Sequence, residues 1–130
     1  MAANTPIAAP ARNEAPFLFD VATSAIAGNK VRLAMRLGAN LLPNWISDAE
    51  GDSKAEEGPV PEEGEFMILP FGGTREQGSH KGYGFAAMVD VLSGILTGGG
   101  YGHIRPFISY GHHVAAYNVE AFMDTGDFKR

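Results

Sequence analysis

The chain has 130 residues, of which 45% are hydrophobic and 19% charged, a balance typical of one globular domain rather than of a disordered chain. The formal net charge of −5 argues against a nucleic-acid partner, and the absence of cysteine excludes disulfides, thiolate catalysis and Cys-ligated zinc. No apolar run reaches the roughly 18 residues that span a membrane, and the N-terminus lacks the features of a signal peptide. We therefore expect a cytoplasmic protein with a single domain over residues 1–130, without a membrane or nucleic-acid partner.

The first part of the chain predicts a strand followed by a helix. The apolar run Phe17–Phe19 predicts a short buried strand. Thr23 or Ser24 is predicted to cap the helix that follows, because a hydroxyl accepts hydrogen bonds from the first free N–H groups of a helix. A helical period gives this helix one apolar face with Lys30 as its polar member, and Gly38 is predicted to end it. The residues predicted on that face are Ile26, Lys30, Leu33, Ala34 and Leu37.

Two segments predict irregular structure. Residues 1–15 form an irregular lead-in that contains two prolines and many small residues. Residues 42–65 are interrupted by prolines and rich in Asp and Glu, which predicts an acidic surface loop within the domain. A metal site built from these carboxylates is the alternative, but EF-hand spacing is missing and we expect no metal.

The second part predicts two further strands and a long apolar helix. Residues 66–69 and 113–118 are strand candidates, and residues 119–122 open a short helix. Residues 82–97 carry apolar side chains at i, i+3, i+4 and i+7, which predicts a helix that the glycines at 98–100 end. The fold class expected from these elements is α/β, with a mixed sheet flanked by at least two helices.

The segment after the first strand is a candidate anion site. A strand that turns into a helix N-terminus exposes free backbone N–H groups at the positive end of the helix dipole, and this geometry suits a cofactor phosphate. An ordinary helix cap is the alternative. The candidate residues are Asp20, Val21, Ala22, Thr23 and Ser24.

Lys81 is a second candidate, since it lies beside His80 and ahead of Gly82 and Gly84 at the start of the second helix. A cation is unfavourable at the positive end of a helix dipole unless an anion is bound there. A solvated loop lysine is the alternative. The glycines do not complete a G-x-G-x-x-G fingerprint, because position 87 is alanine, so a Rossmann fold is not predicted. The histidines have no partner at metal or triad spacing, so the sequence assigns no catalytic residue.

Four motifs in order resemble a known family. They are NTPIA at residues 4–8, FLFDVATS at 17–24, LPFGG at 69–73 and HKGYG at 80–84. The corresponding family segments read GTNPIA, DMATS, LPLGG and KGYG, so this chain departs in the order of Asn and Thr and in a Val for Met. The chain resembles the malate/L-lactate dehydrogenase family of the non-Rossmann type, which includes sulfolactate, ureidoglycolate and diketogulonate dehydrogenases and a cyclic-imine reductase.

The resemblance implies an oxidoreductase that moves a hydride between NAD or NADP and a small 2-hydroxy or 2-oxo acid. It also implies a non-Rossmann NAD(P)-binding domain and association as a homodimer or other oligomer. Carried over position by position, the cofactor-binding residues are Asp20, Val21, Ala22, Thr23, Ser24, His80 and Lys81.

The resemblance covers the central cofactor-binding region of the family alone. Family members are much longer, and their catalytic histidine precedes the segment that NTPIA resembles. We therefore expect a truncated form or fragment, with little or no dehydrogenase activity of its own. The alternative function is a non-catalytic cofactor-binding or structural assembly module, which titration with NADH and NADPH would distinguish.

Overall fold

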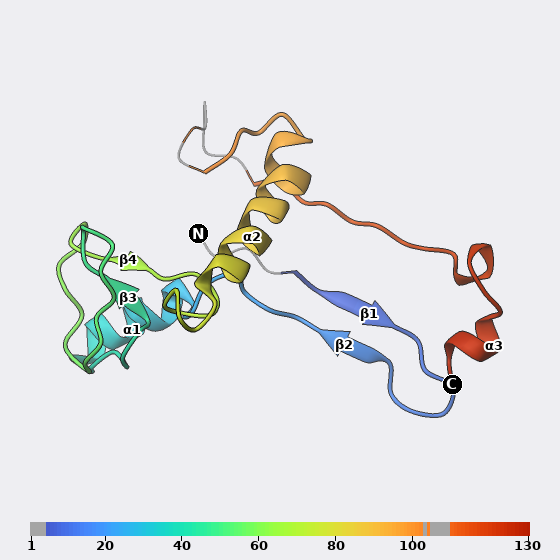
Figure 1. Ribbon diagram of the computed structural model, residues 1–130, viewed down its shortest axis with the longest axis horizontal. Helices are drawn as coiled ribbons and strands as arrows, with labels where there is room; N and C mark the ends of the chain where they lie inside the picture. The colour runs from blue at the N-terminus through green and yellow to red at the C-terminus, as the bar shows by residue number, and fades with distance from the viewer. Residues whose placement is uncertain (1–4, 103, 105–109) are drawn as a thin grey trace. The chain divides into compact units, whose positions relative to one another are not determined.

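The computed structural model describes residues 5–102, 104 and 110–130, and the chain divides into two compact units. The described part of the first unit is Ala22–Val89. The second unit joins Thr5–Val21 to the described part of Asp90–Arg130. Figure 1 shows the helices and strands of both units along the chain. The expectation of a single domain over residues 1–130 stays a prediction.

The first unit contains two helices and one small sheet. In chain order its elements are α1 (Gly28–Leu37), β3 (Ile46–Ser47), β4 (Met67–Ile68) and α2 (Ser79–Val89). Strands β3 and β4 pair antiparallel, with Ile46 opposite Ile68. The strand expected at 66–69 is therefore confirmed at its centre. Strand β3 lies inside the acidic segment 42–65, in which Ile46 and Ser47 are buried while the carboxylates are exposed or half-buried.

A small apolar cluster holds α1 against this sheet. Its buried members are Ile26, Val31, Ala34, Leu41 and Ile46, and Trp45, Val60, Phe66 and Ile68 pack against it. The predicted face is confirmed at Ile26 and Ala34, which are buried, and wrong at Leu33 and Leu37, which are 49% and 71% exposed. Ile26 precedes the helix, so a helical period extended back to it includes Leu33 and Leu37 and leaves out Val31. The helical residues that point inward are Val31 and Ala34.

The predicted start of the first helix is wrong as well, whereas its end is confirmed. Helix α1 begins at Gly28 after Ala27, and no side chain caps it. Ser24 instead forms a bridge with Pro70, so it belongs to an extended segment and not to a helix cap. Gly38 has the left-handed φ of 63°, and its N–H reaches the carbonyls of the last turn. Glycine adopts this conformation without a steric penalty.

The second predicted helix is found, with different bounds and exposure. Helix α2 begins at Ser79, three residues before the expected start at 82, and its α-helical part ends at Val89. The six residues that follow, Asp90–Ile95, form the π-helical segment η1 in the second unit. Among the residues of α2, Gly82 is buried, and Phe85 and Met88 are 51% and 43% exposed. The apolar face that the spacing predicts is therefore largely uncovered in this chain.

The second unit begins with a β-hairpin. Strands β1 (Ile7–Ala9) and β2 (Phe17–Phe19) pair antiparallel, with Ile7 opposite Phe19 and Ala9 opposite Phe17. The strand expected at 17–19 is confirmed, but its burial is not, since all three of its side chains are exposed. The irregular lead-in expected over 1–15 is wrong where it contains β1. Two-stranded sheets are marginally stable alone, and Arg12 ties this hairpin to the chain's end by donating to the carbonyl of Gly126 at 2.8 Å.

Two short helices lie near the C-terminus. The 3₁₀-helix η2 (Val119–Ala121) confirms the helix expected at 119–122. Helix α3 (Thr125–Phe128) is capped by Asp124, whose carboxylate accepts from the N–H groups of Gly126 and Asp127. The strand expected at 113–118 is wrong, because these residues have no regular secondary structure.

The described elements confirm the α/β class in its coarse form. Both strand pairs are antiparallel and lie in separate two-stranded sheets. The strands of the described residues therefore do not make the mixed sheet that was expected. Within the same residues, none of the helices has the length and apolar character needed to cross a membrane.

Candidate functional site

The first turn of α2 carries His80 and Lys81. The helix starts at Ser79, whose N–H donates to the carbonyl of Thr74 at 2.9 Å, and the N–H of Lys81 donates to the carbonyl of Gly78 at 2.9 Å. Both side chains are exposed. Lys81 therefore lies within the first helical turn, close to its expected place at the helix start.

Lys81 is exposed, and its ammonium group has no acidic partner among the described residues. Its side chain turns back over Gly78, where a Cβ atom would lie 3.7 Å from Cδ and 4.0 Å from Nζ. The first turn of a helix is its positive end, so a cation there raises the local positive potential. An anion beside this turn would be stabilised by both charges.

The loop before α2 is tied together by two reciprocal side-chain bonds. The N–H of Gln77 donates to the Thr74 hydroxyl at 3.3 Å, and the N–H of Thr74 donates to Oε1 of Gln77 at 3.4 Å. The backbone N–H of Glu76 and the Thr74 hydroxyl hold the pKa of the Glu76 carboxyl below its ordinary value, and the charge of Arg75 adds to this. The carboxylate at the loop's tip is thus favoured in its ionised form.

The segment Ala22–Ser24 lies extended beside residues 69–71. The carbonyl of Thr23 accepts from the N–H of Phe71 at 2.9 Å, and the N–H of Ala25 donates to the carbonyl of Leu69 at 2.8 Å. Ser24 pairs with Pro70 between these two bonds. Thr23 is buried at 9% exposure. Since the segment is held by strand-like pairing, its backbone position is fixed without a helix N-terminus.

The backbone of Phe71 also touches α2. Gly82 is buried, and a Cβ atom built on it would lie 2.6 Å from the nitrogen of Phe71 and 2.7 Å from its carbonyl carbon, and would overlap its carbonyl oxygen. A second close approach joins Gly72 to the carbonyl of Gly78, with 2.8 Å between its hypothetical Cβ and the carbonyl carbon. The first turn of α2 therefore packs directly on the main chain of residues 71–72.

Phe71 brings together part of the site that the sequence predicts. Thr23 reaches Phe71 by a hydrogen bond, and Gly82, which follows Lys81, touches the same residue on its backbone. Two of the seven predicted cofactor-binding residues, Asp20 and Val21, belong to the second unit instead. There Asp20 is exposed, and the carbonyl of Val21 accepts from the N–H of Thr5 at 3.0 Å.

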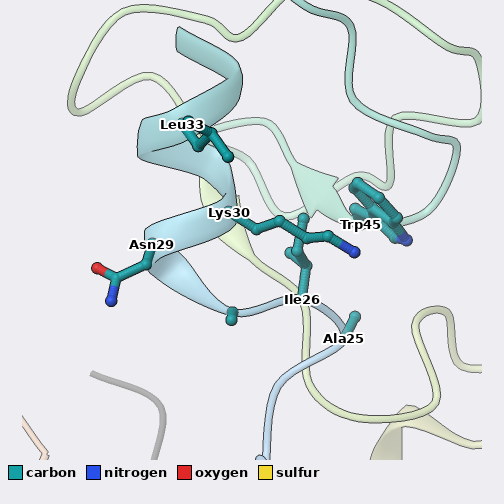
Figure 2. A pocket seen from close by; sticks show the side chains of 7 residues that line it. Ala25, Ile26, Asn29, Lys30, Leu33 and Trp45 are labelled. Carbon is teal, nitrogen blue, oxygen red and sulfur yellow. The ribbon is translucent and has the colours of Figure 1, made fainter. Parts of the chain in front are cut away.

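A shallow groove of about 540 Å³ lies beside the start of α1 (Figure 2). Figure 2 shows the Lys30 side chain pointing toward Trp45, whereas Asn29 points away from it. The ammonium nitrogen of Lys30 is 5.3 Å from the centroid of the Trp45 ring, a distance at which a cation is attracted to the ring face. The groove is lined by Ala25, Ile26, Ala27, Asn29, Lys30, Leu33 and Trp45. The lysine that interrupted the apolar pattern thus contacts the single tryptophan.

The remaining histidines do not add to the site. His112 and His113 are exposed in the second unit, and His103 lies outside the described residues. Over residues 5–102, 104 and 110–130, no three His, Asp or Glu side chains gather in a way that could hold a metal ion.

Two residues organise the site in a way that the sequence does not predict. The sequence presents Phe71 only as part of the LPFGG motif, and Gly82 as one of two glycines that follow the lysine. The glycine-rich spacing was the available signal, but it does not tell which glycine meets another backbone. Gly82 meets the backbone of Phe71, whereas a Cβ on Gly84 would have nothing within 4 Å.

Comparison with known proteins gives one consistent result. The sequence profile of the malate/L-lactate dehydrogenase family matches residues 3–130. A malate dehydrogenase from Pyrococcus horikoshii is 35% identical over 129 residues, which cover 95% of this chain and 35% of that protein. A Delta(1)-pyrroline-2-carboxylate/Delta(1)-piperideine-2-carboxylate reductase from Pseudomonas putida is 39% identical over 92 residues, which cover 71% of this chain and 25% of that protein.

Solved structures agree with the sequence matches. Delta1-piperideine-2-carboxylate reductase from Pseudomonas syringae superposes with a TM-score of 0.60 at 31% identity, covering 83% of this chain and 32% of that one. Malate dehydrogenase from Entamoeba histolytica gives a TM-score of 0.67 at 24% identity, covering 98% and 38% respectively, and at this identity the likeness concerns the fold alone. The chain spans about 35% of the length of the Pyrococcus relatives.

Proposed function

Because the chain belongs to the malate/L-lactate dehydrogenase family, we propose that it forms the nicotinamide-cofactor-binding part of an oxidoreductase acting on a 2-hydroxy or 2-oxo acid. The substrate class is supported by the names of the relatives. Malate carries a hydroxyl group beside a carboxylate, and pyrroline-2-carboxylate carries a C=N bond at the same position. A small carboxylic acid with an oxygen or imine nitrogen at C2 fits both.

The observation that carries the cofactor proposal is the environment of Lys81. Its ammonium group is exposed, lies in the first turn of α2 and has no acidic partner among the described residues. A dinucleotide has a pyrophosphate with two negative charges, so the donors present here fit it. Thr23 and Ser24 lie in the segment fixed by residues 69–71, and with Ala22 and His80 they complete the proposed cofactor-binding residues of the first unit.

In this proposal the chain's residues bind and orient, while the hydride chemistry belongs to the nicotinamide ring when it is bound. Lys81 offsets phosphate charge, and the Ala22–Ser24 backbone provides a fixed edge for the cofactor. Asp20 and Val21 stay predictions from the family resemblance. The non-Rossmann form of the domain and the choice between NAD and NADP belong to the proposal in the same way, and no catalytic residue is assigned.

A titration tests the cofactor proposal. We expect NADH or NADPH to quench the fluorescence of Trp45 or to release heat on mixing, and Lys81→Ala to weaken this binding by about tenfold, as expected for loss of a charged contact. The matched control is Lys54→Ala, since Lys54 is also an exposed lysine of the first unit and pairs with Asp48 at 3.9 Å. Equal losses in the two variants would point to general charge attraction and against a site at Lys81.

Two further properties are proposed with this function. Exposed apolar side chains on α2, such as Phe85 and Met88, favour association as a homodimer; light scattering at increasing concentration tests this, and a monomer throughout would contradict it. We also propose a cytoplasmic location, where NAD and NADP are available to the chain. Cell fractionation tests this location.

A further inference from the structure

We propose that Gly82 is a positioning residue, which acts through the backbone of Phe71 to hold the Lys81 turn of α2 beside the Ala22–Ser24 segment. This inference rests on the proposed function, because it assigns a cofactor-binding consequence to a contact between main chains. All of the contacts that it uses lie within the first unit.

Hydrogen bonds join residues 69–71 to the Ala22–Ser24 segment. The Thr23 carbonyl accepts from the Phe71 N–H at 2.9 Å, and bonds at Leu69 and a bridge at Pro70 keep the two segments in register. Any movement of residues 69–71 is therefore passed to the Ala22–Ser24 backbone.

Helix α2 approaches the backbone of Phe71 at Gly82. Gly82 presents its Cα side to the peptide of Phe71, and a Cβ atom would lie 2.6 Å from the Phe71 nitrogen. Carbon atoms in contact are normally about 3.5 Å or more apart, so a side chain would force the two segments apart by roughly 1 Å. The only residue type that permits the observed approach without such a shift is glycine.

A side chain at position 82 would also displace Lys81. Lys81 and Gly82 are consecutive in the first turn of α2, so a shift of Gly82 away from Phe71 carries the lysine with it. Gly78 and Ser79, at the start of α2, also lie close to Gly72, since a Cβ on Gly72 would be 2.8 Å from the Gly78 carbonyl carbon and 3.0 Å from the Ser79 nitrogen. This end of the helix therefore has little free space toward residue 72. A misplacement of about 1 Å can cost a large part of a charged contact's contribution to binding.

A double-mutant cycle tests whether Gly82 acts through Lys81. NADH and NADPH are titrated into the wild-type chain, Lys81→Ala, Gly82→Ala and the double variant, with Gly84→Ala as the matched control on the open side of the same helix. We expect each single variant to bind about tenfold more weakly, and the double variant to be within about twofold of Lys81→Ala. Gly84→Ala should bind like the wild type.

The outcomes separate this inference from the proposed function. If the wild type binds neither cofactor, the proposed function fails and this inference with it. If the wild type binds but the two losses simply multiply in the double variant, Gly82 has a merely structural effect and the inference alone fails.

Hydrogen exchange of the wild type covers the case in which Gly82→Ala does not fold. NADH is expected to slow exchange of the Phe71 amide, which bonds to Thr23, together with the amides of the first turn of α2. Slower exchange in that turn with no change at Phe71 would overturn the proposal.

Discussion

The peptide of Phe71 lies directly against the Cα atom of Gly82, with the Phe71 nitrogen 2.6 Å from where a Cβ would stand. The same peptide nitrogen donates to the carbonyl of Thr23 at 2.9 Å. One backbone segment thus contacts both stretches of the first unit that the sequence marks as candidate cofactor contacts. The stability of this arrangement depends on the absence of a side chain at one helical position.

Alanine substitutions at the two glycines of α2 should have opposite effects on stability. Gly84→Ala has open space and should raise the free energy of unfolding by about 0.5–1 kcal/mol, because alanine loses less entropy in a helix. Gly82→Ala should lower it by about 1–3 kcal/mol through overpacking against Phe71. Urea unfolding followed by circular dichroism measures both, and equal effects would contradict the close contact.

The inward face of α1 can be tested by two truncations on the same helix. Val31 is 3% exposed and Leu33 is 49% exposed. Val31→Ala should lower the free energy of unfolding by about 2 kcal/mol, because it removes buried methyl groups and leaves a cavity. Leu33→Ala should change it by less than about 1 kcal/mol. A larger loss for Leu33→Ala would restore the face that the sequence pattern predicted.

The fluorescence of Trp45 can test whether the Lys30 ammonium group lies over its ring. Replacing Lys30 with Gln removes the cation from above the ring, and we expect a change in the fluorescence of this single tryptophan and a stability loss of about 0.5–1 kcal/mol. Arg32→Gln, which changes an exposed cation of the same helix, serves as the control. Identical emission spectra of Lys30→Gln and the wild type would show that the ammonium group does not stay over the ring in solution.

The pKa of Glu76 should rise when the Thr74 hydroxyl is removed. Thr74→Val deletes one cause of the lowered pKa, whereas the backbone N–H of Glu76, which is the larger cause, remains. Arg75→Gln should raise the pKa by less, because the charge of Arg75 is the smallest of the lowering causes. Carbon-detected NMR titration of the Glu76 carboxyl measures both, and an unchanged midpoint in Thr74→Val would exclude the hydroxyl's role.

The sign of the linked stability effect follows from the direction of this shift. A carboxyl whose folded pKa is depressed stabilises the fold above its unfolded pKa, and this contribution is lost as the pH falls through the folded value. Because Glu76 is fully exposed, we expect this pH-dependent stabilisation to act on the loop 74–78 alone.

Local features were predictable from the sequence where short-range chemistry decides them. Gly38 ends α1 because a left-handed residue is needed there, and the apolar run Phe17–Phe19 pairs as a strand. What failed depends on the tertiary context. The face of α1 is set by Ile46 and Leu41, which lie beyond the helix, and the cap at Thr23 or Ser24 is replaced by pairing with residues 69–71.

The candidate site was predictable as two separate segments but not as an arrangement. The motifs around Thr23 and Lys81 each stand out by their residues. Their connection through Phe71 depends on a strand-like pairing between segments far apart in the chain and on one particular glycine, and neither periodicity nor spacing contains this information.

The main-chain character of the contact at Phe71 gives positions 71 and 82 very different tolerance to substitution. The Phe71 side chain is 48% exposed, while its backbone nitrogen and carbonyl make the contacts to Thr23 and Gly82. Most residues other than proline should therefore serve at position 71, since only proline lacks the N–H. Position 82 should strongly favour glycine, because any Cβ atom there meets the backbone of Phe71. In a saturation library selected for folding, position 71 should vary freely while glycine is strongly enriched at position 82.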